Sequence, residues 1–268
     1  MRVLMVGDVV GKPGRQLAQD LVPHLKAEHN VDFVIVNGEN AAGGIGITPD
    51  IAAAFLHHGA NVVTLGNHAW GKREIYPFLD EEPRLLRPAN YPPGAPGQGV
   101  GVYACPAGRI AVISLQGRTF MDPIDDPFRA VDSILETVLN KTTMICVDFH
   151  GEATSEKQAF GWYVDGRVSA VIGTHTHVQT ADERILPGGT AYLTDVGMTG
   201  PIDSVIGMRP DLVVPRFLSQ LPARFGVAEG EAQLSGVLID IDPTTGRATH
   251  IRRLQSPPYR TQRQSDAG

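Results

Sequence analysis

Two histidines, His175 and His177, stand one residue apart directly behind an apolar run at positions 168–172. The run is short, rich in valine and isoleucine, and followed by glycine, which predicts a buried β-strand. If strand geometry continued past Gly173, both imidazoles would point to the same face, because side chains alternate along a strand. Neutral imidazoles are common metal ligands, so the pair could bind metal ions. For this stretch taken alone, two exposed loop histidines are the alternative.

Other polar side chains also lie where predicted strands end. Strands are predicted near residues 2–7, 33–36, 61–65 and 144–147, and helices over about 14–29 and 48–58 separate the first three. This alternation is typical of a parallel sheet, whose strands all present their carboxyl ends at one edge. The residues expected to converge at such ends are Asp8, Glu39, Asn40, Asn67, His68, His150, His175 and His177.

Carboxylate, amide and imidazole groups form a mixed oxygen and nitrogen donor set. Such a set suits iron, manganese or zinc and is a poor match for magnesium or calcium alone. Two ions about 3.5–4 Å apart can clamp a phosphoryl group and generate hydroxide near neutral pH. Single residues have structural alternatives: Asp8 could cap the next helix, and His150 could be a hydrogen-bonded core histidine. Independent structural roles would not place all eight residues at strand ends, which favours metal binding.

The order and spacing of these motifs resemble the calcineurin-like metallophosphoesterases, and within them the YmdB-like phosphodiesterases. Three runs are typical of the YmdB-like group: Gly-Asp-Val-Val-Gly at 7–11, Asn-Gly-Glu-Asn at 37–40 and Asp-Phe-His-Gly-Glu at 148–152. The resemblance covers most of the chain. It implies an α/β fold of two packed mixed β-sheets flanked by helices, and we expect one domain over residues 1–268 with a frayed tail from about residue 256.

The resemblance also implies a role for each residue. It implies two divalent or trivalent metal ions, with iron preferred over manganese and zinc, and a metal-bridging hydroxide as nucleophile. His68 would not bind metal; it would donate a proton to the leaving oxygen or stabilise the phosphoryl charge. Val10 stands where the wider superfamily has a histidine, and Asn40 is the substitute ligand. The implied ligands are Asp8, Glu39, Asn40 and His177 for one ion, and Glu39, Asn67, His150 and His175 for the other.

These features predict a metal-dependent phosphodiesterase that hydrolyses small phosphodiesters, by resemblance 2′,3′-cyclic nucleotides. The alternative is a nucleotide-binding regulatory protein that keeps the two-metal site with low turnover. A dinucleotide-dependent dehydrogenase is excluded, because residues 7–14 lack the Gly-x-Gly-x-x-Gly spacing.

Composition sets the remaining expectations. A net charge of −6 disfavours stable binding to nucleic-acid polymers and leaves a small nucleotide as the substrate. No apolar run is long enough to predict a membrane span. Cys105 and Cys146 cannot form a disulfide framework, so we expect buried free thiols in a cytoplasmic protein. Loops rich in proline and glycine suggest a homo-oligomer, and we expect Asp195 to shape a loop or an interface and not to bind metal.

Overall fold

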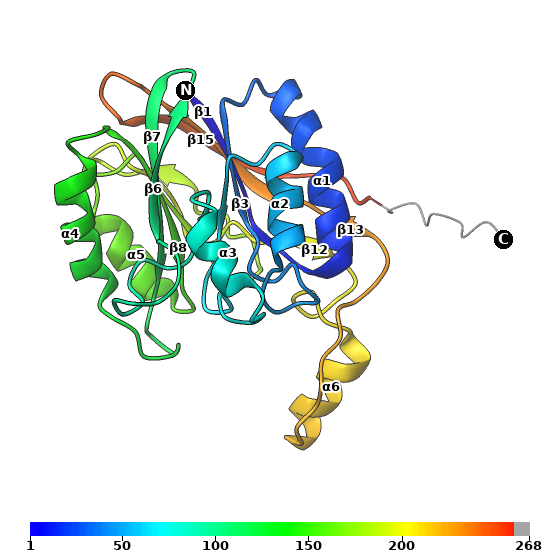
Figure 1. Cartoon of the computed structure of the whole chain (residues 1–268). Helices are drawn as coiled ribbons and strands as arrows, with labels where there is room; N and C mark the ends of the chain where they lie inside the picture. Colours follow the sequence, from blue (N-terminus) through cyan, green and yellow to red (C-terminus); the bar gives the residue numbers. More distant parts are fainter. Residues whose placement is uncertain (260–268) are drawn as a thin grey trace.

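The computed structural model describes residues 1–259, and its elements form four layers in the order helix, sheet, sheet, helix (Figure 1). Two six-stranded sheets pack face to face. Helices α1 (Gly11–Glu28) and α2 (Pro49–His57) cover the outer face of one sheet, and α4 (Pro127–Val138) and α5 (Thr154–Tyr163) cover the outer face of the other. The expected α/β fold with two packed mixed sheets is therefore confirmed.

The first sheet has the strand order β15-β14-β1-β3-β4-β5. Its strands β1, β3, β4 and β5 are parallel, whereas β14 and β15 are antiparallel to their neighbours. The parallel strands lie under helices on one side and against the second sheet on the other, which explains why they consist of unbroken apolar runs. Their bounds are β1 Arg2–Val6, β3 Phe33–Asn37, β4 Val62–Thr64, β5 Leu85–Leu86, β14 Ser235–Ile241 and β15 Ala248–Gln255.

The second sheet has the order β10-β11-β9-β8-β7-β6. Strands β7, β8, β9 and β11 are parallel, and β6 and β10 pair antiparallel at the two edges. Strands β6 and β7 form an antiparallel hairpin around residue 107. The bounds are β6 Val100–Cys105, β7 Gly108–Gln116, β8 Met144–His150, β9 Ala170–Thr174, β10 Arg184–Ile185 and β11 Ala191–Leu193.

A third, three-stranded sheet was not predicted. Strands β2 (Asp8–Val9), β12 (Met198–Pro201) and β13 (Ala232–Gln233) form it, in the order β13-β12-β2. These strands are too short to show an apolar pattern. The pairing of β2 with β12 brings the segment after β1 beside the segment that follows β11.

The central core lies between the two large sheets. Apolar side chains from β1 and β3 meet those from β7, β8 and β9, and helices pack against the outer faces in two further clusters. Burial of this kind stabilises by about 25 cal/mol per Å² of apolar surface, so the sandwich supplies a rigid frame for the strand ends. Residues that define the central cluster include Val3, Met5, Phe33, Ile35, Ile110, Val112, Cys146 and Ile172.

Several local expectations need correction. The first helix begins earlier than the predicted residue 14, because α1 begins at Gly11. The predicted frayed tail falls mostly on residues 260–268, which lie outside the described part, whereas Ser256 donates a backbone hydrogen bond to Leu234 and Tyr259 pairs with Ala232. Cys146 is buried, whereas Cys105 is only partly so, and both are free. Two helices, α3 (Ile75–Glu81) and α6 (Pro210–Ser219), were not predicted.

No helix within residues 1–259 has the length and apolar character needed to span a membrane.

Candidate metal centre

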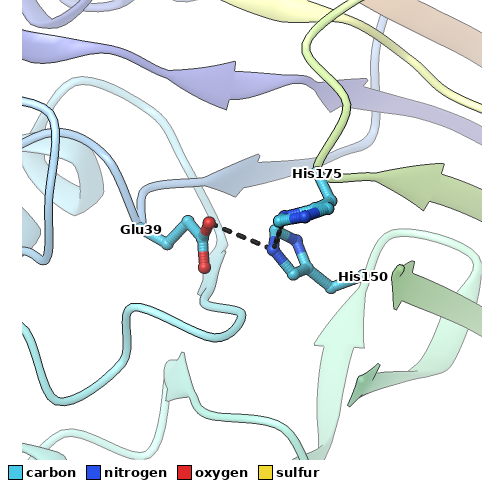
Figure 2. Close-up of side chains that lie close together, drawn as sticks. All are labelled: Glu39, His150 and His175. Atoms are coloured by element: carbon cyan, nitrogen blue, oxygen red, sulfur yellow. Dashed lines mark hydrogen bonds and ion pairs between the residues drawn. The ribbon is translucent and has the colours of Figure 1, made fainter. Parts of the chain in front are cut away.

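The carboxyl ends of parallel strands from both large sheets meet at one place. Asp8 follows β1, and Glu39 and Asn40 follow β3 in the first sheet, while His150 ends β8 and His175 follows β9 in the second. Figure 2 shows the Glu39 carboxylate facing the imidazoles of His150 and His175 from the opposite side. One potential ligand atom from each of these three residues lies within 4.8 Å of the other two. The packing of the two sheets thus brings residues more than a hundred positions apart into one cluster.

Three other potential ligand atoms crowd around one ring nitrogen of His150. Its Nε2 lies 3.0 Å from Glu39 Oε1, 2.8 Å from Asn67 Oδ1 and 3.0 Å from His175 Nδ1. His150 is fully buried, and Glu39 is as well. A carboxylate oxygen, an amide oxygen and two imidazole nitrogens that converge in this way can hold a metal ion.

The other nitrogen of His150 has a fixed partner. Thr174 Oγ1 lies 2.8 Å from His150 Nδ1 and donates its own hydrogen to Asp148 Oδ1 at 2.7 Å. Asp148 also accepts from Asn37 Nδ2 and Thr64 Oγ1, so all its partners are donors. Because the Thr174 hydroxyl donates to Asp148, it accepts from His150 Nδ1–H. In the neutral ring this leaves the Nε2 lone pair directed into the cluster, as a metal ligand requires.

His175 and His177 show the same division between their two ring nitrogens. His175 Nε2 lies 3.2 Å from a Glu152 carboxylate oxygen, which leaves Nδ1 facing His150. His177 Nδ1 donates to the carbonyl oxygen of Ile206 at 2.8 Å, which leaves Nε2 without its proton in the neutral ring. Each imidazole therefore has one nitrogen bonded to the protein frame and one available as a ligand.

With the His150 ring in its neutral, metal-binding form, three buried oxygens among the described residues have no hydrogen-bond partner: Asp8 Oδ1, Glu39 Oε1 and Asn40 Oδ1. An unsatisfied buried acceptor costs about 1–3 kcal/mol, so three in one place call for a shared partner. The orientation of the Asn40 amide is fixed, because its Nδ2 donates to the Gly44 carbonyl at 3.0 Å. The oxygens belong to residues expected to bind metal, and a cation is the partner that would satisfy all three.

Charges in the cluster shift the pKa values of its acids and bases. Burial raises the pKa of Asp8 to about 6, although His177 and His150 oppose the shift. Burial lowers the pKa of His150, but the charges of Glu39 and Asp8 outweigh it and raise the value to about 9. Without a cation, the two carboxylates thus draw a second proton onto His150. A metal ion bound there would take the place of that proton.

The strand geometry does not continue to His175 and His177, so their side chains do not alternate as strand residues would. Strand β9 ends at Thr174, and the two histidines have φ of 99° and 67°, in the left-handed region. His175 lies beside His150, while the charge of His177 acts on Asp8. The two imidazoles therefore serve different sides of the cluster, from a tight turn and not from a strand.

The structure also bears on the possible helix-capping role of Asp8 and on the expected loop role of Asp195. Asp8 does not cap α1, whose N-cap residue is Val10 with no side-chain cap bond. The Asp195 carboxylate accepts hydrogen bonds from Lys157, Thr176 and Gly197, so it is bound to other protein groups and not directed at a metal ion. Its expected loop role fits these contacts.

His68 lies at the rim of the cluster. Its Nδ1 is 3.1 Å from Asn40 Nδ2 and 3.3 Å from Glu39 Oε1, and its backbone N–H donates to Glu39 Oε2. Since one hydrogen of the Asn40 amide goes to Gly44, the other points to His68 Nδ1, which places the imidazole proton on Nε2. One third of the His68 side chain is exposed, so a molecule bound at the rim can contact the imidazole.

Sequence reasoning missed Thr174 and Lys157. Thr174 is part of the Gly-Thr-His-Thr-His run but has no distinguishing feature in the sequence. Lys157 had a usable signal: it precedes Phe160, Gly161 and Val164 by three, four and seven positions, which is the spacing of the buried face of a helix.

Comparison with known proteins identifies the family. A model of the family described as YmdB-like protein matches residues 4–254. The chain is 54% identical over 254 residues to the 2′,3′-cyclic-nucleotide 2′-phosphodiesterase of Bacillus subtilis (strain 168), a match that covers 95% of this chain and 96% of that protein.

Two solved structures are also similar. A hypothetical protein from Thermus thermophilus is 42% identical with a TM-score of 0.90, covering 96% of this chain and 99% of that one. A novel phosphatase from Mycoplasma pneumoniae is 34% identical with a TM-score of 0.90, and the match covers 96% of this chain and 94% of that one. All eight residues of the predicted site lie within the part that the family model matches. The chain therefore belongs to the family of YmdB-like proteins.

Proposed function

We propose that this protein is a metal-dependent phosphodiesterase that hydrolyses 2′,3′-cyclic nucleotides. The observation that carries the proposal is the set of three unpaired buried oxygens beside imidazole nitrogens directed at them. The 54% identity to a 2′,3′-cyclic-nucleotide 2′-phosphodiesterase supports the choice of substrate.

The mixed oxygen and nitrogen donor set supports the choice of iron, manganese or zinc, and the family resemblance favours two ions with iron ahead of the other metals. Glu39 is the proposed shared ligand, because His150, His175 and Asn67 lie on one side of its carboxylate and Asp8 and Asn40 supply the other unpaired oxygens. When bound, such ions would activate water near neutral pH and neutralise phosphoryl charge. The proposed ligands are Asp8, Glu39, Asn40 and His177 for one ion and Glu39, Asn67, His150 and His175 for the other.

His68 is the proposed proton donor. Asn40 and Gly44 together hold its proton on Nε2, at the exposed rim of the cluster. From there His68 would protonate the departing ribose oxygen as the phosphorus–oxygen bond breaks. The buried carboxylates and imidazoles below it would exclude bulk water from all but the open side, which strengthens their electrostatic effect.

A direct test uses purified protein stripped of metal and reloaded with Fe²⁺, Mn²⁺ or Zn²⁺ separately. We expect hydrolysis of 2′,3′-cyclic AMP and of bis-p-nitrophenyl phosphate only in the reloaded samples. Equal rates with and without metal would contradict the proposal, and so would metal-dependent cleavage of the model compound without cleavage of the cyclic nucleotide.

The Thr174 hydroxyl gives a further prediction. Thr174→Val keeps the side-chain volume but removes the group that connects His150 Nδ1 to Asp148. Loss of a hydrogen bond that orients a metal-binding imidazole typically weakens metal affinity by about 10- to 100-fold, and we expect that loss for Mn²⁺ measured by isothermal titration calorimetry.

Thr190→Val is the matched control for that variant. It removes a hydroxyl that is also fully buried, but one that donates to Val168 before the start of β9, at the other end of the sheet. Equal Mn²⁺ affinity in the two valine variants would contradict the role given to Thr174.

A further inference from the structure

Lys157 is a buried lysine on the inner face of α5. Its side chain is 1% exposed, and its Nζ lies 2.7 Å from Asp195 Oδ2 and 2.7 Å from the Thr174 carbonyl oxygen. Asp195 is fully buried as well. Burying two charges costs desolvation that their attraction often fails to repay, so a buried ion pair is weak evidence for a gain in stability. Its contacts indicate another role.

The ion pair contacts both peptide groups that flank His175. Lys157 donates to the carbonyl of the Thr174–His175 peptide, and Asp195 Oδ2 accepts from the N–H of the His175–Thr176 peptide at 3.0 Å. The second carboxylate oxygen of Asp195 accepts from Gly197 N at 2.8 Å. The turn that contains both histidines is therefore bonded to a fixed point in the core.

This turn needs such support because its backbone is strained. Residues other than glycine rarely adopt the left-handed region, and both His175 and His177 lie there. The strained conformation directs His175 Nδ1 at His150 and places His177 against Ile206.

Gly173 allows the close packing that brings the pair to the turn. A Cβ at this position would lie 1.8 Å from the Thr194 carbonyl oxygen and 3.2 Å from Lys157 Cδ. The glycine before the turn thus makes room for the segment that carries Asp195 and for the lysine stem.

We propose that Lys157 and Asp195 are a positioning pair that holds residues 174–177 in the conformation in which both imidazoles reach their metal ions. The inference rests on the proposed metal centre. Both residues act through the backbone of the turn, so they set metal affinity without being ligands.

The test compares Mn²⁺ binding by wild-type protein and by Lys157→Met, measured by titration calorimetry on metal-free full-length protein. We expect the variant to bind Mn²⁺ about 10- to 100-fold more weakly. The Mn²⁺ concentration for half-maximal cleavage of bis-p-nitrophenyl phosphate should rise by the same factor, while kcat at saturating Mn²⁺ stays near the wild-type value.

Arg2→Met is the control, because it breaks the 2.7 Å ion pair between Arg2 and Asp240 at the amino end of β1, opposite the end that is followed by Asp8. It should bind Mn²⁺ like the wild type. A folded Lys157→Met variant with wild-type Mn²⁺ affinity would overturn the positioning role.

The double variant Lys157→Met/Asp195→Asn separates positioning from simple charge balance, and replaces the single variant if that one does not fold. It leaves no unpaired buried charge, so its thermal unfolding midpoint should approach that of the wild type, whereas its Mn²⁺ affinity should stay low. If the unfolding midpoint and the Mn²⁺ affinity both returned to the wild-type values, the pair would only balance charge, and the inference would be overturned. Wild-type protein that binds no Mn²⁺ would instead refute the metal centre itself, and the inference with it.

Discussion

Glu39→Gln is expected to abolish phosphodiester hydrolysis, lowering kcat/KM by about 10³-fold or more, because several kcal/mol of metal-derived stabilisation would be lost. Glutamine has nearly the same shape but no negative charge, and it brings N–H groups into a cluster of acceptors. Glu39 Oε1 lies 3.0 Å from His150 Nε2 and is one of the unpaired buried oxygens. Elemental analysis of the purified variant should show loss of metal together with loss of rate.

Glu152→Gln is the graded comparison for Glu39→Gln. Glu152 is half exposed and contacts only the outer nitrogen of His175, so its loss should weaken metal affinity by about 10- to 100-fold and leave activity recoverable by added metal. If Glu39→Gln kept its metals and its wild-type rate, Glu39 would not be the shared ligand.

His68→Ala is expected to lower kcat by about 10²- to 10⁴-fold, the usual contribution of a general acid, while the protein keeps its full metal content. The expectation follows from the position of His68, which contacts Asn40 and Glu39 at the rim of the cluster and has one third of its side chain exposed. The measurements are steady-state hydrolysis of 2′,3′-cyclic AMP and elemental analysis of the same samples.

His58→Ala is the control for this variant, since His58 lies at the end of α2 and its Nδ1 contacts the carbonyl of Ala54 within the same helix. It should hydrolyse at the wild-type rate. A His68→Ala rate equal to that of the control would refute the proton-donor role. Little turnover by wild-type protein that nevertheless binds the nucleotide would favour the regulatory alternative.

The sequence predicted the sheets well because their inner strands are buried on both faces. Strands such as β3 and β8 contain apolar runs that stand out from their surroundings. It also predicted that Glu39, His150 and His175 would meet, because parallel strands in packed sheets deliver their ends to a common place.

Other features depend on tertiary contacts that leave little trace in the sequence. Strand β2 has two residues and pairs with a segment almost two hundred positions away, so no local pattern marks it. Helix α6 contains Pro215, which weakens a helical pattern. The turn at His175 differs from a strand because Lys157 and Asp195 bind its peptide groups, and the buried hydrogen bonds around Asp148 are equally long-range.

The most direct measurement is anomalous X-ray diffraction from crystals of the protein grown with Mn²⁺. The account predicts two neighbouring manganese peaks, one next to Asp8, Asn40 and His177 and the other next to Asn67, His150 and His175, with Glu39 contacting both. Manganese peaks located elsewhere, or none between these side chains at a concentration that supports hydrolysis, would contradict it.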